Sequence, residues 1–134
     1  AYFELKDQDR VGFLGAAHQM DEFINGVVAT CDFIGAKKRS KRRLKLSFDE
    51  WNIWYESRFV GHRNLGWERA PRLIEDEYTV EDAVVVGNLL MSLLRHCDRI
   101  GVACLAQLVN VIAPIRSEPD APAWPRGRHV RPMT

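Results

Sequence analysis

Apolar residues recur at helical intervals in the first part of the chain and predict a helix over residues 13–38. The series that follows helical spacing is Leu14, Ala17, Met20, Ile24, Val27 and Val28. Lysines gather at the end of this segment, where the helix dipole favours positive charge. The opening residues AYFEL are predicted as the end of a strand, and a polar loop separates them from the helix.

The rest of the pattern predicts a strand, a long loop, a helix and a second strand. Residues 44–49 read as a short buried strand, and residues 56–78 form an irregular segment whose length suggests a functional role. A helix is predicted from Thr79 to about His96, because Thr79 can cap it and acids follow in its first turn. The apolar run VACLAQLVNVIAP is typical of a strand in a parallel sheet. We therefore expect an α/β fold in which residues 102–108 pair in parallel with residues 44–49 through a right-handed crossover.

The composition is that of an ordinary soluble domain. The chain has 134 residues, of which 46% are hydrophobic and 28% charged, and its net charge is +1. No overall field therefore favours nucleic acid or an anionic membrane, and we expect neither as a partner. Three unevenly spaced cysteines argue against a disulfide scaffold and favour a reducing compartment, so a cytoplasmic location is expected. Because the chain starts without Met, we expect it to be a piece of a longer protein.

The stretch LSFDEWNIWYESRF places two carboxylates, Asp49 and Glu50, where the predicted strand ends. In parallel α/β folds that edge holds the active site, because the loops after the strands converge there. A carboxylate set among Trp51, Trp54 and Tyr55 is expected to be partly desolvated, and flat rings beside a carboxylate can hold a sugar. The alternative is an Asp that caps a turn beside an ordinary aromatic cluster, and spacing alone leaves both interpretations open.

Gln107 is a lone amide in the last apolar run, predicted to lie on the final strand. Burying such an amide without a partner costs about 1–3 kcal/mol. Its side chain is therefore either satisfied by the backbone or directed into a polar site at the end of the strand.

Two charged clusters have simpler interpretations. Residues 37–45 carry seven Lys and Arg and could contact phosphates, but no aromatic residues are interleaved, which favours a solvated helix end and connecting loop. The acids of residues 74–82 could bind a metal, but they include no histidine and fit a helix N-terminus. The histidines have no zinc-like spacing to the cysteines, so we expect no metal and no other cofactor.

Three blocks of this sequence resemble consecutive blocks of one enzyme family. They are LSFDEWNIWY, LIEDEYTVEDAVVVGNLLMSLLRHCDR and VACLAQLVNVIAPI, and their order and spacing resemble glycoside hydrolase family 51, the α-L-arabinofuranosidases. The resemblance covers roughly residues 1–124 and implies a (β/α)8 TIM barrel, of which this chain would be the C-terminal segment, about strands six to eight with their helices. Residues 125–134 depart from the family pattern and form a divergent tail rich in Pro and Arg.

The resemblance also implies roles for individual residues. The family's nucleophile is the Glu of the DEWN block, which is Glu50 here, and its sugar pocket includes residues that match Tyr2, Trp54 and Gln107. We interpret Asp49 as a support that orients neighbouring groups. The family's second catalytic Glu, its acid/base, has no match in this chain.

The function implied by the resemblance is retaining hydrolysis that releases terminal non-reducing α-L-arabinofuranosyl residues from arabinose-containing polysaccharides or oligosaccharides. Retention uses two carboxyl groups about 5–5.5 Å apart, and this chain supplies one of them. We expect the isolated chain to be inactive and to need the missing half of the barrel, or a partner copy in a homo-oligomer. The alternative is a non-catalytic carbohydrate-binding or interaction fragment of the same barrel, distinguished by whether an acid on another chain lies near Glu50.

Overall fold

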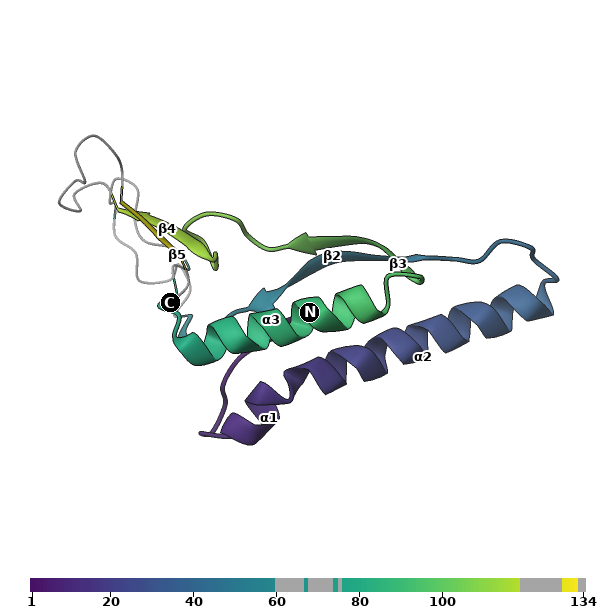
Figure 1. The fold of residues 1–134 in the computed structure, drawn as a ribbon, viewed down its shortest axis with the longest axis horizontal. Helices are drawn as coiled ribbons and strands as arrows, with labels where there is room; N and C mark the ends of the chain where they lie inside the picture. The colour runs from purple at the N-terminus through teal and green to yellow at the C-terminus, as the bar shows by residue number, and fades with distance from the viewer. Residues whose placement is uncertain (60–66, 68–73, 75, 119–128, 133–134) are drawn as a thin grey trace.

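The computed structural model describes residues 1–59, 67, 74, 76–118 and 129–132. Three parallel strands form one sheet in the order β1-β2-β3, and they are β1 (Tyr2–Phe3), β2 (Leu46–Ile53) and β3 (Ile100–Leu105). Helices α2 (Ala16–Lys37) and α3 (Val80–Arg95) lie side by side under one face of this sheet (Figure 1). The predicted α/β fold with a parallel sheet is therefore confirmed, and so is the parallel pairing of β2 with β3.

The first helical segment is divided in two. Helix α1 (Arg10–Leu14) ends at Gly15, whose amide donates to the Val11 carbonyl, and α2 starts at the next residue. The stripe that packs into the core is Phe13, Ala16, Met20 and Ile24, at helical spacing. The predicted apolar series is right for Met20 and Ile24 but wrong for Leu14, which is exposed because the break at Gly15 changes the course of the helix.

Helix α3 begins and ends where the sequence predicts. Thr79 and Asp82 form a capping box in which each side chain bonds to the other's backbone amide. Val85, Leu89 and Leu93 are buried one turn apart and pack against the sheet and α2.

The strands differ from the prediction in their limits. Strand β2 continues to Ile53 instead of ending at residue 49, because its last residues pair with β1, Tyr2 with Asn52 and Phe3 with Ile53. Strand β3 ends at Leu105, so Gln107 lies after the strand and not on it. Positions 101–104 of β3 are all exposed, so this strand is not covered on both faces by the described residues.

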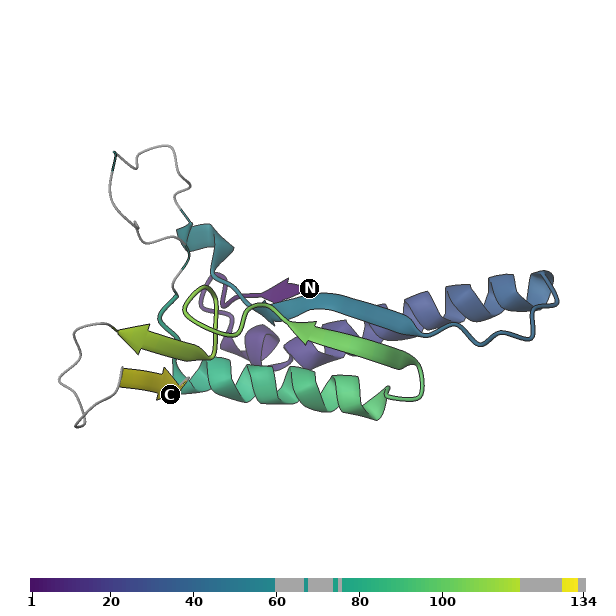
Figure 2. The same cartoon turned by 90° about the horizontal axis from the view of Figure 1, so that it is seen from above.

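The C-terminal part contains two strands that the sequence did not predict, because their residues show no periodic pattern. Strands β4 (Ile115–Glu118) and β5 (His129–Pro132) pair in antiparallel register as a separate two-stranded sheet at one end of the molecule (Figure 2). Of the predicted long loop 56–78, the short 3-10 helix η1 (Glu56–Arg58) and a few other residues are described, and the rest lies outside the described residues.

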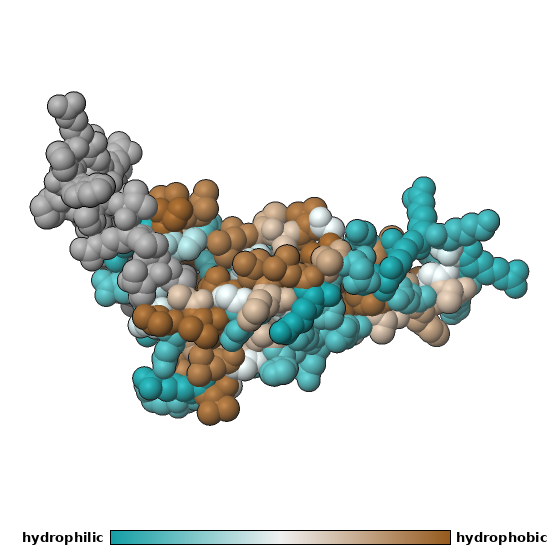
Figure 3. Space-filling model, in the orientation of Figure 1, coloured by the Kyte–Doolittle hydropathy of each residue, from teal (hydrophilic) through white to brown (hydrophobic). Residues whose placement is uncertain are grey.

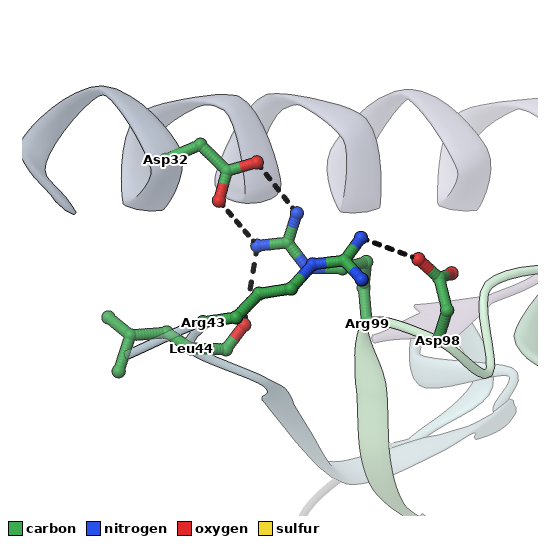
Figure 4. Close-up of polar contacts among 5 residues, drawn as sticks. All are labelled: Asp32, Arg43, Leu44, Asp98 and Arg99. Carbon is green, nitrogen blue, oxygen red and sulfur yellow. Dashed lines mark hydrogen bonds and ion pairs between the residues drawn. The ribbon is translucent and has the colours of Figure 1, made fainter. Parts of the chain in front are cut away.

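The basic connection between α2 and β2 is exposed, as predicted, and Arg99 fixes its end. The Arg99 guanidinium donates to both oxygens of Asp32 on α2, at 2.7 and 2.8 Å, and to the Leu44 carbonyl at 3.3 Å (Figure 4). Arg43 of the connection donates to Asp98 at 2.8 Å. These bonds join the end of α2, the start of β2 and the start of β3.

Apolar side chains remain exposed over much of the surface. They gather across the middle of the face seen in Figure 3, and α3 and β3 contribute Val84, Leu90, Met91, Leu94 and Val102 to the exposed set. Within the ranges that the structure describes, no helix is long and apolar enough to cross a membrane.

Candidate active site

A β-bulge in β2 exposes the two candidate carboxylates. Phe48 pairs with Ala103 and Trp51 pairs with Leu105, so three steps along β2 match two steps along β3. The extra residue lets both Asp49 and Glu50 face solvent, although neighbouring side chains of a regular strand point to opposite faces. The bulge therefore presents Glu50 to solvent just before the buried end of the central strand, Trp51–Ile53.

Two of the three aromatic residues expected around Glu50 belong to the core instead. Trp51 and Tyr55 are each only 4% exposed and pack within the main hydrophobic cluster. Glu50 itself is exposed, so the expected desolvation by three rings is wrong for this chain. Both rings are close to Glu50 in the sequence, but Trp51 packs into the core from β2, and Tyr55 packs into it from the segment that follows the end of β2 at Ile53.

The structure brings together Tyr2, Glu50 and Trp54. The Tyr2 hydroxyl donates to Glu50 Oε2 at 2.9 Å across the β1–β2 pair. The rings of Tyr2 and Trp54 meet edge to face with their centroids 5.3 Å apart. Burial and then the hydrogen bond to Glu50 raise the pKa of Tyr2 to about 12. Three of the residues singled out in the sequence thus form one cluster, with a carboxylate, a neutral donor and an aromatic surface.

Gln107 is linked to β2 through the backbone of the residue before it. It follows Ala106, whose amide donates to the Trp51 carbonyl at 3.2 Å, one residue after Glu50. The Gln107 amide donates to the Ile112 carbonyl at 3.3 Å, which closes a tight loop, and its side chain is exposed. Of the two interpretations given to this residue, burial with a backbone partner is therefore excluded by the exposed side chain.

Asp49 is held within its own strand. Its Oδ1 accepts a hydrogen bond from the Ser47 hydroxyl at 2.5 Å, and both residues are exposed. This bond fixes the Asp49 carboxylate on the side of the sheet away from the buried Phe48.

A cleft of about 280 Å³ opens next to Tyr2 and Trp54. Glu4 lines it, and this carboxylate accepts hydrogen bonds from the Ser57 amide at 3.1 Å and the Ser57 hydroxyl at 2.8 Å, and pairs with Lys6 at 3.0 Å. Burial alone would raise the pKa of Glu4, but the bonds from Lys6 and Ser57 lower it overall. No group of three His, Cys, Asp or Glu suited to a metal ion occurs in the described ranges.

Asn52 is a residue that the sequence reasoning missed. It is fully buried on β2, and its amide nitrogen donates to the carbonyls of Ala106, at 2.7 Å, and Ile112. The signal was present in the sequence, since an amide between Trp51 and Ile53 in a strand needs partners for the reason given for Gln107.

The family described as the alpha-L-arabinofuranosidase C-terminal domain matches residues 49–128. The chain belongs to this family. An intracellular exo-alpha-(1→5)-L-arabinofuranosidase of Streptomyces lividans is 58% identical over 125 residues, which cover 92% of this chain and 19% of that protein. The protein of the same name in Halalkalibacterium halodurans is 51% identical over 123 residues, 92% of this chain and 25% of that protein. The chain therefore spans a quarter or less of these curated relatives.

Solved structures agree with this assignment. AbfB, a family 51 alpha-L-arabinofuranosidase from Bifidobacterium longum, matches with a TM-score of 0.79 at 39% identity, over 92% of this chain and 26% of AbfB. An alpha-L-arabinofuranosidase from Thermotoga maritima, solved as an arabinose complex, matches with a TM-score of 0.63 at 26% identity, over 87% of this chain and 21% of that one. The resemblance to family 51 is confirmed.

Proposed function

We propose that this chain is the part of a retaining α-L-arabinofuranosidase that carries the nucleophile, Glu50. The observation that carries the proposal is the contact of Glu50 Oε2 with the Tyr2 hydroxyl at 2.9 Å, with Trp54 packed on Tyr2. An exposed carboxylate oriented by a neutral donor beside a flat ring has the parts needed to attack a sugar carbon. The substrate class is a terminal non-reducing α-L-arabinofuranosyl residue of a poly- or oligosaccharide.

The fold assignment in this proposal is the C-terminal segment of a (β/α)8 barrel over residues 1–124, followed by a tail over residues 125–134. The sheet has three parallel strands, and helices cover one of its faces. This arrangement fits part of a barrel, in which helices cover the outer face of the strands and side chains fill the interior. The relatives named as intracellular enzymes support the expected cytoplasmic location.

The reaction divides between this chain and the missing part of the barrel. The Glu50 carboxylate attacks the anomeric carbon while an acid outside this chain protonates the departing glycosidic oxygen, and a glycosyl ester forms on Glu50. Water, deprotonated by the same outside group, then cleaves the ester and frees arabinose with its configuration retained. Trp54 offers a flat surface to the sugar, Gln107 a hydrogen bond to its hydroxyls, and Asp49 orients neighbouring groups.

The experiment uses a segment-exchange chimera in which this chain replaces the aligned segment of the Streptomyces lividans relative. A slow fluorinated α-L-arabinofuranoside should leave a covalent label on Glu50, located by mass spectrometry of peptides. Glu50→Gln should abolish the label yet retain sugar binding, since the amide keeps the shape but cannot attack. Asp49→Asn, the matched control on the neighbouring residue, should still acquire it. A label on another carboxylate would refute the assignment, and an unlabelled chimera that binds the sugar would favour the non-catalytic alternative.

A further inference from the structure

Asn52 lies two residues after Glu50, is 0% exposed, and has no part in the proposed reaction. We propose that Asn52 is a positioning residue that sets the place of Gln107 relative to Glu50. This inference rests on the proposed function, because it concerns the sugar pocket of that same site.

The segment from Ala106 to Ile112 is called here the Gln107 loop. The hydrogen bonds connect Asn52 to both ends of it. Its Nδ2 donates to the Ala106 carbonyl at 2.7 Å, which belongs to the peptide group leading into Gln107. It also donates to the Ile112 carbonyl, and that same oxygen accepts from the Gln107 amide at 3.3 Å. The Ala106 amide in turn donates to the Trp51 carbonyl at 3.2 Å. Consecutive residues of β2 therefore carry the candidate nucleophile and hold the backbone on both sides of Gln107.

The chemistry of these bonds suits the amide group of an asparagine. Both partners are carbonyl oxygens, which only accept, so the side chain must supply two N–H donors. An aspartate would place a third acceptor against them, a serine supplies one donor, and an apolar residue supplies none. The Asn52 Oδ1 atom, on the other side of the amide, is buried without a partner within the described residues. The loop is thus held by one amide group whose orientation its partners determine.

The test is a double-mutant cycle in the segment-exchange chimera, with kcat/KM measured on 4-nitrophenyl α-L-arabinofuranoside. Asn52→Ala and Gln107→Ala should each lower kcat/KM by about 10- to 100-fold, because small displacements of a positioning group have effects of this size. If Asn52 acts through Gln107, the double variant should lose no more than about 3-fold beyond the larger single loss. A role in folding alone would instead give losses that multiply.

Ser92→Ala is the matched control. Ser92 is as buried as Asn52, at 0% exposure, and its hydroxyl donates to Asp21 between α2 and α3 instead of to the Gln107 loop. Whatever loss it causes should multiply with that of Gln107→Ala. If Asn52→Ala does not fold, Asn52→Ser retains one donor and enters the same cycle with a smaller expected loss. If the chimera is active and the kcat/KM losses of the Asn52 and Gln107 variants multiply in the double variant, the inference is overturned and the proposed function stands. If the chimera has no arabinofuranosidase activity, both the proposed function and the inference are overturned.

Discussion

Tyr2 gives Glu50 a donor that does not titrate in the ordinary range of pH. Burial and the neighbouring carboxylate raise the pKa of Tyr2 to about 12, so its hydroxyl stays protonated at neutral pH. A bond from a neutral hydroxyl orients the carboxylate without neutralising its charge, which suits a group that must attack as an anion.

Replacing Tyr2 with Phe should therefore weaken catalysis without adding a pH dependence. Phe keeps the ring against Trp54 but removes the hydroxyl, and a hydrogen bond to a charged group contributes about 1.5–3 kcal/mol. We expect a loss in kcat/KM of about 10- to 100-fold in the chimera, with an unchanged alkaline limb of the pH–rate profile. Tyr2→Ala, which also removes the edge-to-face contact, should lose more. Equal kcat/KM for Tyr2→Phe and the unsubstituted chimera would show that this bond has no catalytic role.

The role of a single residue could be predicted where it follows from neighbouring residues in the sequence. It could not be predicted where it depends on whether the side chain is buried. Sequence neighbours grouped Trp51, Trp54 and Tyr55 around Glu50, and the family resemblance singled out Trp54. The burial of Trp51 and Tyr55 follows from packing that the neighbouring residues do not specify. The rule that a buried amide needs a partner was applied to Gln107, yet the buried amide is Asn52. Burial depends on contacts between distant segments, which a linear pattern does not contain.

At the scale of elements, the start of α3 depends on the capping box at Thr79. The Thr79 hydroxyl and amide donate to Asp82 Oδ2 at 2.8 and 2.6 Å. Thr79→Ala should destabilise this helix start by about 1 kcal/mol, the usual effect of losing such a cap. Asp82→Ala should cost more, because the Tyr55 hydroxyl, 2.7 Å from Asp82, would lose its acceptor in the core. Hydrogen exchange of the first-turn amides of α3 measures both; equal protection in the two variants would contradict this ranking.

The ion pair between Asp32 and Arg99, which joins α2 to the start of β3, should be sensitive to acid. Hydrogen bonding to Arg99, aided by its charge, lowers the pKa of Asp32 below its ordinary 3.8. A depressed carboxyl pKa contributes stability above the unfolded value, and this contribution is lost as the pH falls through the folded value. The junction of α2 with β3 should therefore loosen below about pH 4, and Asp32→Asn should remove that pH dependence.

Thermal unfolding of the chimera between pH 5 and pH 3 measures this effect. Asp98→Asn is the control, because its partner Arg43 is 64% exposed and an exposed ion pair contributes little. A pH slope that Asp32→Asn leaves unchanged, or that Asp98→Asn removes equally, would assign the acid sensitivity to other groups.

Local signals also explain which elements were predictable. Helix α3 carries its cap, its acidic first turn and its buried stripe within one continuous stretch, so its bounds followed from the sequence. The bulge at Asp49 and Glu50 arises from the register between β2 and β3, which lie about fifty residues apart, and no local pattern specifies it. The pairing of β4 with β5 was not predicted either. Their residues do not alternate between apolar and polar, and ten residues, 119–128, separate the two strands in the sequence, so no local pattern indicates the pair.

At the scale of the whole molecule, the sheet has a helical layer on one face (Figure 1). Residues 49 and 50 of β2 and 101–104 of β3 are exposed. The outer strands β1 and β3 have no further neighbour in the three-stranded sheet that the described residues form. A barrel segment has this shape, because further strands would extend both edges and close the open face around the site. The candidate site lies on the central strand of this three-stranded sheet.

The isolated chain should accordingly show no turnover of an aryl α-L-arabinofuranoside. General acid catalysis typically supplies about 10²–10⁴-fold of rate, and two nearby candidates, Glu4 of the cleft and Asp49 next to Glu50 in the chain, already have other partners. Glu4 is bonded to Lys6 and Ser57, and Asp49 to Ser47. The segment-exchange chimera supplies the absent acid from the relative's own barrel and should be active.

The comparison is made at equal molar concentrations of purified isolated chain, chimera and Glu50→Gln chimera. We expect activity in the unsubstituted chimera alone, because the proposed reaction needs both a nucleophile on this chain and an acid on the other segment. Substantial turnover by the isolated chain, sensitive to Glu50→Gln, would mean that another carboxyl of this chain serves as the acid, with Glu75 and Glu77 the first to replace. Turnover by the isolated chain that survives Glu50→Gln would separate the activity from Glu50 altogether and would remove the proposed mechanism.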